Sequence, residues 1–286
     1  IITTPFSYVA TTSSIVWEGC EPVFVDINHQ TLNIDPNLIE AAITSKTSAI
    51  LATHVYGNPC DIDAIASIAS KYNLKVIYDA AHSFGTKYKN RSVLSYGDIS
   101  TVSFHATKLF HTVEGGAVTT TDQELYTKMA LLRNFGHVSP YEFALPGING
   151  KNSEFHAAMG LCNLSYITEI INRRKDIVKR YDERLSGTSI TRPLMQSYTE
   201  WNYAYYPILF ENEASLLSAM ASLEKHYVYT RRYFYPSLNK LSYLKVQDSL
   251  KNSEHAAKCV LCLPLYHTLS YEEIDMIADI IIKTIN

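Results

Sequence analysis

Short β-branched runs alternate with amphipathic stretches through the first half of the chain. The strand-like runs are "PVFVDI" (22–27), "SAILATHV" (48–55), "KVIYD" (75–79) and "DISTVSF" (98–104). Between them, "DPNLIEAAI" (35–43) and "DIDAIASIASKYN" (61–73) space their apolar residues as a helix does. Asp35 followed by Pro36 opens the first of these helices, and Asp61 caps the second. Strands that alternate with helices predict an α/β fold with a mostly parallel sheet.

The second half begins with a long helical pattern. From Gly150 to about Leu185, apolar residues recur at helical spacing with charges between them, and a segment of this length is suited to bridging two domains. Strand and helix then alternate again. These later segments are "YAYYPILF" (203–210), "ASLLSAMASLEKH" (214–226), "CVLCLPL" (259–265) and "SYEEIDMIADIIIKTI" (270–285). We expect a large domain over residues 1–170 and a smaller α/β domain over residues 171–286.

Composition narrows the class of protein. The chain has 286 residues, of which 47% are hydrophobic, and its net charge of -3 gives no basic field for nucleic acid or an anionic membrane. No apolar stretch has the roughly 18 to 20 residues that cross a bilayer. Five scattered cysteines predict no disulfide framework, which favours a reducing, cytoplasmic location. Cys259 and Cys262 have the spacing of a metal knuckle, but without a second pair a buried strand is favoured.

Polar residues at strand ends are the first candidates for chemistry. Ligands of open α/β sheets sit beyond the carboxyl ends of the strands. Asp79 ends "KVIYD", His82 follows it, Ser103 ends "STVSF" and Lys108 lies just beyond. A partly desolvated lysine can form an imine at neutral pH, although a lysine in a loop is more often merely solvated.

An acid at a neighbouring strand end changes that balance. A pyridoxal 5′-phosphate (PLP) site pairs an imine-forming lysine with a carboxylate that keeps the pyridine nitrogen protonated, as Lys108 and Asp79 would. The phosphate also needs donors, for which Ser103 is a candidate, unless it bonds only to its own backbone. The pattern therefore predicts a PLP site.

The residues around Lys108 fit a pocket wall. Gly115 and Gly116 suit a tight turn, where a missing side chain lets the backbone pass near the site. His105 and His111 lack further ligands at metal spacing, so we expect them to line a pocket rather than to bind a metal.

With these residues assembled, the chain resembles the DegT/StrS family of PLP-dependent sugar aminotransferases, which have the fold type I (aspartate aminotransferase-like) architecture. The likeness spans nearly the whole chain. The matching blocks, in order, are "TTPFSYVATTSS", "FVDI", "THVYGNPCDID", "YDAAHSFG", "SFHATKLFHTVEGGAV", "LLRNFGH", "GINGKNSEFHAAMG", "TRRYFYP" and "CLPLY". Several blocks in the right order are more specific than any one of them.

The resemblance implies a role for each matched residue. Lys108 would be the Schiff-base lysine and proton carrier, Asp79 would pair with the pyridinium nitrogen, and His82 would lie beside the ring hydroxyl, where the family often has Gln. Ser103 would hold the phosphate. Tyr8 occupies the place of an aromatic residue that stacks on the ring.

The resemblance also implies a homodimer with shared active sites, because Asn149 in "GINGK" would reach the phosphate of the neighbouring subunit's cofactor. Two features depart from the family pattern. The family's Gly-Ser/Thr turn ahead of Ile1 lies outside this sequence, so we expect an N-terminal part to be missing, and Asn152 stands where Met is usual. Relatives with His in place of the lysine are dehydratases, and Lys108 argues against that branch.

The implied reaction moves an amino group from L-glutamate to a nucleotide-linked keto-sugar. "SFHATKLFHT" is most similar to enzymes that convert dTDP-4-keto-6-deoxy-D-glucose to dTDP-4-amino-4,6-dideoxy-D-glucose (viosamine) for bacterial O-antigen and other surface polysaccharide. For the sugar nucleotide, Arg231, Arg232, Tyr233 and Tyr235 in "TRRYFYP" offer charges, hydroxyls and rings, and His105 is a further candidate. Ordinary ion pairing at a domain edge is the other explanation for the arginines.

Two other functions remain open at this point. One is a fold type I enzyme that acts on an amino acid, of the desulfurase or aldolase type, which would need an arginine clamp or a mobile cysteine loop that the sequence does not reveal. The other is a catalytically inactive sensor domain that keeps the fold. Intact Lys108 and Asp79 argue against the sensor.

Overall fold

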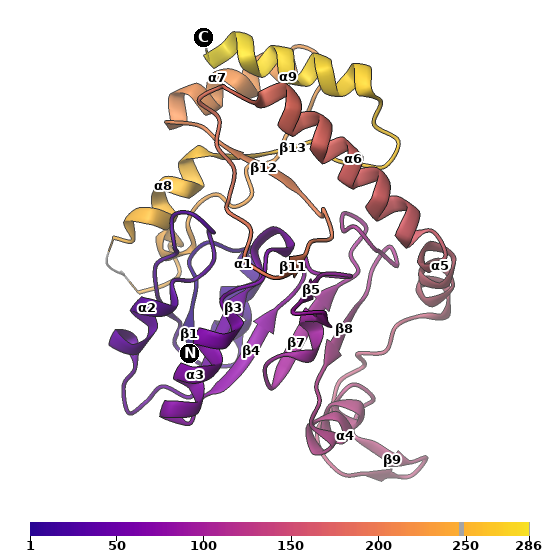
Figure 1. The fold of residues 1–286 in the computed structure, drawn as a ribbon. Helices are drawn as coiled ribbons and strands as arrows, with labels where there is room; N and C mark the ends of the chain where they lie inside the picture. Colours follow the sequence, from indigo (N-terminus) through magenta and orange to yellow (C-terminus); the bar gives the residue numbers. More distant parts are fainter. Residues whose placement is uncertain (246–248, 286) are drawn as a thin grey trace.

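A six-stranded sheet is the centre of the first half of the chain in the computed structural model, which describes residues 1–245 and 249–285 (Figure 1). The strand order is β2-β1-β3-β4-β7-β8, and every neighbouring pair is parallel except β7 with β8. The strands are β1 (Ile2–Thr3), β2 (Val23–Phe24), β3 (Ala49–Thr53), β4 (Lys75–Asp79), β7 (Ile99–Ser103) and β8 (Gly116–Thr119). The α/β class with a mostly parallel sheet is thereby confirmed.

Three helices accompany these strands, and the sequence pattern identified two of them. In α3 (Ile62–Tyr72), Asp61 accepts a hydrogen bond from the Ala64 N–H, as the predicted cap requires. The expected helix over 35–43 is shorter, with α2 (Pro36–Ile39) followed by a 3-10 turn. The third helix, α1 (Val9–Trp17), was not predicted. It buries two threonines beside one isoleucine, so its buried face carries no clear apolar period.

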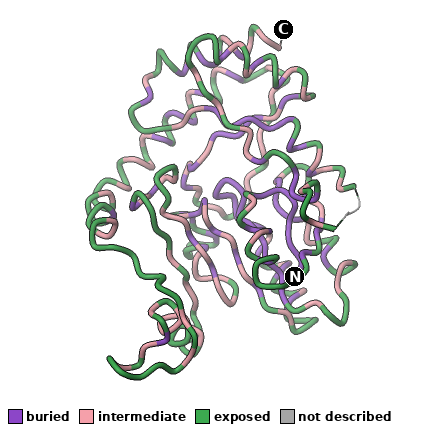
Figure 2. The backbone as a smooth tube through the Cα atoms, turned by 180° about the vertical axis from the view of Figure 1, so that it is seen from behind, coloured by how far each residue is buried: buried purple, intermediate pink, exposed green. Residues whose placement is uncertain are grey.

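An arm and two short sheets follow the central sheet. The arm consists of α4 (Gln123–Leu132) and the hairpin β9 (His137–Ser139) and β10 (Glu142–Phe143), and it extends away from the body of the molecule (Figure 1). Figure 2 shows that nearly all of its residues are exposed or half-buried. A smaller sheet joins β5 (Lys87–Tyr88), β6 (Arg91–Ser92) and β11 (Thr199–Glu200).

The long helical segment is two helices rather than one. α5 (Glu154–Leu164) ends before Ser165, and α6 (Ile167–Leu185) begins after Tyr166. The Ser165 hydroxyl donates to the Cys162 carbonyl, a local bond that competes with helix continuation. The predicted helical segment is therefore confirmed as helical but is interrupted at Ser165 and Tyr166, and α6 runs into the C-terminal half.

The C-terminal half has its own core. Strands β12 (Tyr206–Leu209) and β13 (Val260–Leu263) pair antiparallel, and α6, α7 (Glu213–Glu224) and α9 (Tyr271–Ile285) pack their apolar side chains together with them. Cys262 lies on buried β13, as predicted, whereas Cys259 ends the unpredicted helix α8 (Lys251–Cys259). The domain boundary at residues 170 and 171 stays a prediction. No helix of the described residues is long and apolar enough to cross a membrane.

Contacts between the two halves set the walls of the cleft between them. Phe6 and Val55 of the first half pack in one cluster with Phe234 and Val260 of the second. Asp26 adds a polar tie, because its carboxylate accepts the N–H groups of Asn252 and Ser253 in the first turn of α8.

His54, fully buried directly after β3, predicts a loss of stability in acid. Burial lowers the pKa of His54 to about 3. The Cys60 N–H donates to its Nδ1, and the ring stacks on Tyr78. Because the unfolded chain takes up this proton near pH ~6.5, the free energy of unfolding should fall by up to about 1.4 kcal/mol per pH unit as pH drops from there. Urea unfolding at several pH values measures how the free energy of unfolding depends on pH. His54→Gln should reduce this dependence. An unchanged dependence in the variant would show that His54 is not its cause.

Candidate active site

The carboxyl ends of the central strands open onto one cavity of about 750 Å³. Its size suits a small ligand or cofactor. In register, Asp79 pairs with Thr53 on one side and with Thr101 on the other, so these three side chains share a face of the sheet. The sequence-predicted residues that line this cavity are Tyr8, Asp79, His82, Ser103, His105, Lys108, Arg231 and Tyr233.

A cluster of phenylalanines holds the loop that carries Lys108. Phe110 is buried, stacks on Phe84 at 4.3 Å between ring centroids, and meets Phe104 edge-on at 5.0 Å. The Thr112 N–H donates to the Phe104 carbonyl and closes the loop. Lys108 therefore sits on a well-anchored turn rather than on a free surface loop.

Burial and charge act together on the Lys108 amine. Burial lowers the pKa of Lys108, the Asp79 carboxylate opposes that shift, and the Arg231 guanidinium adds to it. An amine with a lowered pKa has a larger neutral fraction near pH 7, and only the neutral form is a nucleophile. Asp79 meanwhile accepts hydrogen bonds from the Thr11 hydroxyl at 2.6 Å and from the Ala81 N–H at 3.1 Å.

His82 is held in one neutral form. Burial, with a smaller effect of Lys108, lowers the pKa of His82 well below its usual value. The Tyr56 N–H donates to its Nδ1 at 3.3 Å, so the ring proton lies on Nε2. Tyr205 packs against the ring at 4.5 Å between centroids. His82 thus offers a fixed N–H donor rather than a cation.

The glycine turn and the histidines behave as pocket walls. A Cβ atom at Gly115 would lie 2.3 Å from Thr112 Oγ1, and one at Gly116 would lie 2.8 Å from the Val102 carbonyl oxygen. Only glycine permits this close approach. His105 lines the cavity, and His111 lines a second cavity behind the Lys108 loop. Within the described residues, no group of three or more His, Cys, Asp or Glu is placed to hold a metal.

The two adjacent arginines have different surroundings. Arg231 lines the cavity and donates to the Tyr233 hydroxyl at 2.9 Å. Arg232 instead forms an ion pair with Glu213 at 2.7 Å and stacks on Tyr235. Neither Arg232 nor Tyr235 lines the cavity, and the Arg232 side chain is already used within the C-terminal half, so their contact with the substrate stays a prediction.

Asn149 is not in the cavity of its own chain. It bridges to Asn134 beside the exposed arm, and the Lys151 ammonium donates to its side-chain oxygen at 2.8 Å. Its place in the fold leaves a role at a neighbouring subunit as a prediction.

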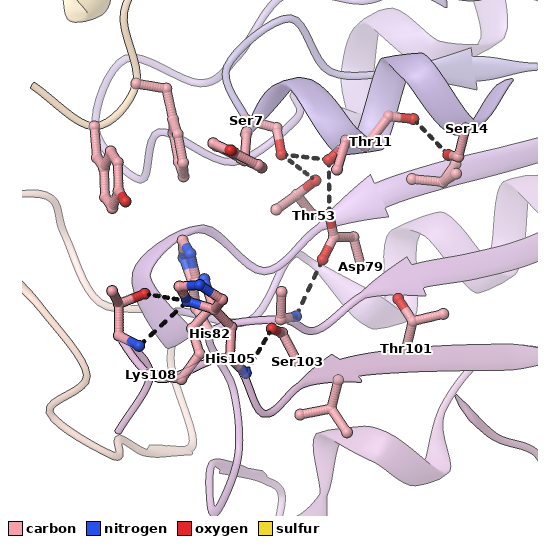
Figure 3. A pocket seen from close by; sticks show the side chains of 18 of the residues that line it. Ser7, Thr11, Ser14, Thr53, Asp79, His82, Thr101, Ser103, His105 and Lys108 are labelled. Atoms are coloured by element: carbon pink, nitrogen blue, oxygen red, sulfur yellow. Dashed lines mark hydrogen bonds between the residues drawn. The ribbon is translucent and has the colours of Figure 1, made fainter. Parts of the chain in front are cut away.

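Several cavity residues were not singled out from the sequence. Ser7, Thr11 and Thr53 form a chain of hydroxyls that ends on Asp79 (Figure 3). The signal was the cluster of Ser and Thr in "FSYVATTSS", which is ordinary for a loop and carries no spacing rule. Phe234 also lines the cavity and stacks on His82.

Comparison with known proteins gives independent evidence on the family to which the chain belongs. The model of the DegT/DnrJ/EryC1/StrS aminotransferase family matches residues 1–282. A dTDP-4-amino-4,6-dideoxy-D-glucose transaminase of Shigella dysenteriae is 45% identical over 98% of this chain and 78% of its own length. DesI, solved in the presence of its TDP-sugar product, superposes with a TM-score of 0.91 at 34% identity, covering 98% of this chain and 73% of DesI. The PLP form of Spr1654 from Streptococcus pneumoniae has a TM-score of 0.90 at 27% identity, covering 99% and 80%.

Proposed function

The chain belongs to the DegT/DnrJ/EryC1/StrS aminotransferase family, and from this membership we propose that it uses PLP to move an amino group from L-glutamate to a nucleotide-linked keto-sugar. The observation that carries the proposal is that Lys108 and Asp79 line the same cavity at the carboxyl edge of the sheet. The same pair argues against an inactive sensor domain, and the family match supports this function over an amino-acid enzyme of the same fold.

The chemistry of the cavity fits PLP. Asp79 is an acceptor for a protonated ring nitrogen, and Lys108 is an amine of lowered pKa for an aldehyde. Ser103 brings a hydroxyl for the phosphate, His82 brings an N–H donor, and Tyr8 brings a half-exposed ring at the cavity wall. The ring nitrogen, the aldehyde, the ring hydroxyl and the phosphate of the cofactor therefore each have at least one counterpart in the cavity.

When bound, PLP supplies an aldehyde that carries the amino group and a protonated ring that stabilises negative charge. Lys108 would hold the cofactor between turnovers and, once displaced by the donor's amine, take the proton from the carbon that bears the amino group. Asp79 would keep the proton on the ring nitrogen. His82 would orient the ring through its Nε2 proton. Glutamate and keto-sugar give 2-oxoglutarate and amino-sugar, and both halves of the exchange use the Lys108 amine.

The sugar nucleotide would meet the cationic side of the cavity. Arg231 is exposed, and no carboxylate of residues 1–245 and 249–285 forms an ion pair with it, so its charge is free for a diphosphate. Tyr233 and His105 would add polar contacts at the same wall. The name of the Shigella relative supports dTDP-4-amino-4,6-dideoxy-D-glucose as the product. We propose dTDP-4-keto-6-deoxy-D-glucose as the corresponding acceptor, and a cytoplasmic role in making O-antigen or related lipopolysaccharide.

A panel assay tests the function. Purified protein with PLP is incubated with glutamate and dTDP-, GDP- and UDP-linked keto-sugars, and 2-oxoglutarate release is followed. We expect release with the dTDP sugar and an absorption band near ~420 nm from lysine-bound PLP. If only free amino acids react, the sugar assignment fails; if no PLP binds, the whole proposal fails.

We also propose that the active unit is a homodimer. The arm and α5 expose a run of large apolar side chains that is unusual on a monomer, with Tyr141 95% and Phe155 90% exposed. Asn149 lies at the base of this surface and outside the cavity of its own chain. A second copy would cover the apolar residues, and Asn149 would then reach the partner's cofactor phosphate.

Combining two impaired variants in one dimer tests this sharing. Asn149→Ala should lower activity about tenfold, because a hydrogen bond to a charged phosphate is lost. Co-expressed with Lys108→Ala under two different tags and purified through both, the mixed dimer should have about half of wild-type activity, because one of its two sites has both Lys108 and Asn149. Absence of recovery in mixed dimers purified through both tags would mean that Asn149 serves its own chain.

A further inference from the structure

Beside Asp79, in the wall of the cavity, lies a chain of three buried hydroxyls. Thr11 Oγ1 is 2.6 Å from Asp79 Oδ2, Ser7 Oγ is 2.7 Å from Thr11 Oγ1, and Ser7 Oγ is 3.1 Å from Thr53 Oγ1 (Figure 3). The three side chains are almost equally buried, at 2% exposure for Ser7 and 4% for Thr11 and Thr53. They come from the start of α1 and from the end of β3, and they meet at the end of β4.

The direction of each hydrogen bond in this row of hydroxyls follows because each hydroxyl has only one proton to donate. An ionised carboxylate only accepts, so Thr11 gives its single hydroxyl proton to Asp79. The Thr11 oxygen can then only accept from Ser7, and Ser7 in turn accepts from Thr53. Every hydroxyl therefore donates toward Asp79, and bonds aligned in this way strengthen one another.

The Thr11 hydroxyl makes its hydrogen bond to Asp79 instead of to a carbonyl of its own helix. A threonine inside a helix can bond back to the carbonyl of the preceding turn. In α1, Thr11 instead directs its hydroxyl across to β4. Because Asp79 Oδ1 takes the Ala81 N–H, both carboxylate oxygens are tied and the plane of the carboxylate is set.

We propose that Thr11 is a positioning residue for Asp79, with Ser7 and Thr53 as the ordered support behind it. The inference rests on the proposed PLP function, since Thr11 gives its only hydroxyl proton to Asp79 and would act on the cofactor through that carboxylate. A carboxylate set in this way directs its charge at one point in the cavity, where the ring nitrogen would lie.

The test uses graded variants of the purified protein with PLP. Thr11→Val, which keeps shape but not the hydroxyl, should weaken PLP binding about tenfold and shift the pH midpoint of the bound cofactor's absorption change. Thr11→Ser should restore both to within about twofold. Ser7→Ala should have a smaller effect and Thr53→Val the smallest, because each is one bond further from Asp79.

A merely structural role gives a different pattern. Equal burial would then make the three effects similar, Thr11→Ser would not rescue, and the pH midpoint would not move; any of these results overturns the proposal. Thr11→Val should also add nothing to the spectrum of Asp79→Asn, whereas an additive change would contradict a role through Asp79. If Thr11→Val does not fold, as judged by thermal melting, the order of Ser7→Ala and Thr53→Val decides.

The two proposals fail in different ways. Wild-type protein that binds no PLP would refute the proposed function and this inference with it. If the wild-type protein binds PLP and the Thr11→Val variant binds it with the same affinity and spectrum, this inference alone is refuted.

Discussion

Lys108→Ala is expected to abolish transamination, with kcat lowered by at least about a thousandfold. Of the described residues that line the cavity, Lys108 alone has a primary amine, so no neighbour can replace it. Without it the cofactor is not held covalently, and no base reaches the carbon that loses its proton. The measurement is 2-oxoglutarate release, together with the absorption near ~420 nm, which should disappear.

A lysine far from the cavity is the matched control for this prediction. Lys179 on α6 is 77% exposed and pairs only loosely with Glu183 at 4.0 Å. Lys179→Ala should keep wild-type turnover and spectrum. A Lys108→Ala protein that retains turnover within about tenfold of the wild type would rule out the proposed mechanism.

Asp79→Asn is expected to lower kcat by about a hundredfold or more, with PLP still bound. The amide is close in shape to the carboxylate, but it carries no charge to keep a proton on the ring nitrogen. Without that proton, the ring stabilises negative charge poorly. The measurement is kcat with saturating PLP, alongside the absorption spectrum of the bound cofactor.

A carboxylate at the amino ends of the same strands provides the control. Asp98 lies just before β7 and holds Lys75 and the Val76 N–H at 2.8 Å each. Asp98→Asn should lower stability, because two hydrogen bonds to a charged group weaken, but it should leave kcat unchanged. Equal losses of kcat in both variants would mean that Asp79 acts only through the fold.

The strands that carry the site could be predicted because apolar or β-branched side chains recur along them and alternate positions are buried. Residues 75–79 form β4 as the apolar pattern indicated, and β7 lies within the predicted 98–104. The pattern failed where burial involves hydroxyls rather than hydrocarbon. Helix α1 buries Thr11 and Thr12, so it was missed, and with it the support of Asp79. The arm was missed for the converse reason, since its apolar residues are exposed.

The sequence by itself determined the fold class, the family and the identity of the reactive groups, because strand composition and residue type are local properties. Only the tertiary structure decided which of two adjacent arginines faces the cavity, which nitrogen of His82 carries the proton, and which hydroxyls lie beside Asp79. These depend on partners far away in the chain: Glu213 for Arg232, Tyr56 for His82, and α1 for β4. Hydrogen bonds and ion pairs are directional and short, so they are set only when distant segments have packed.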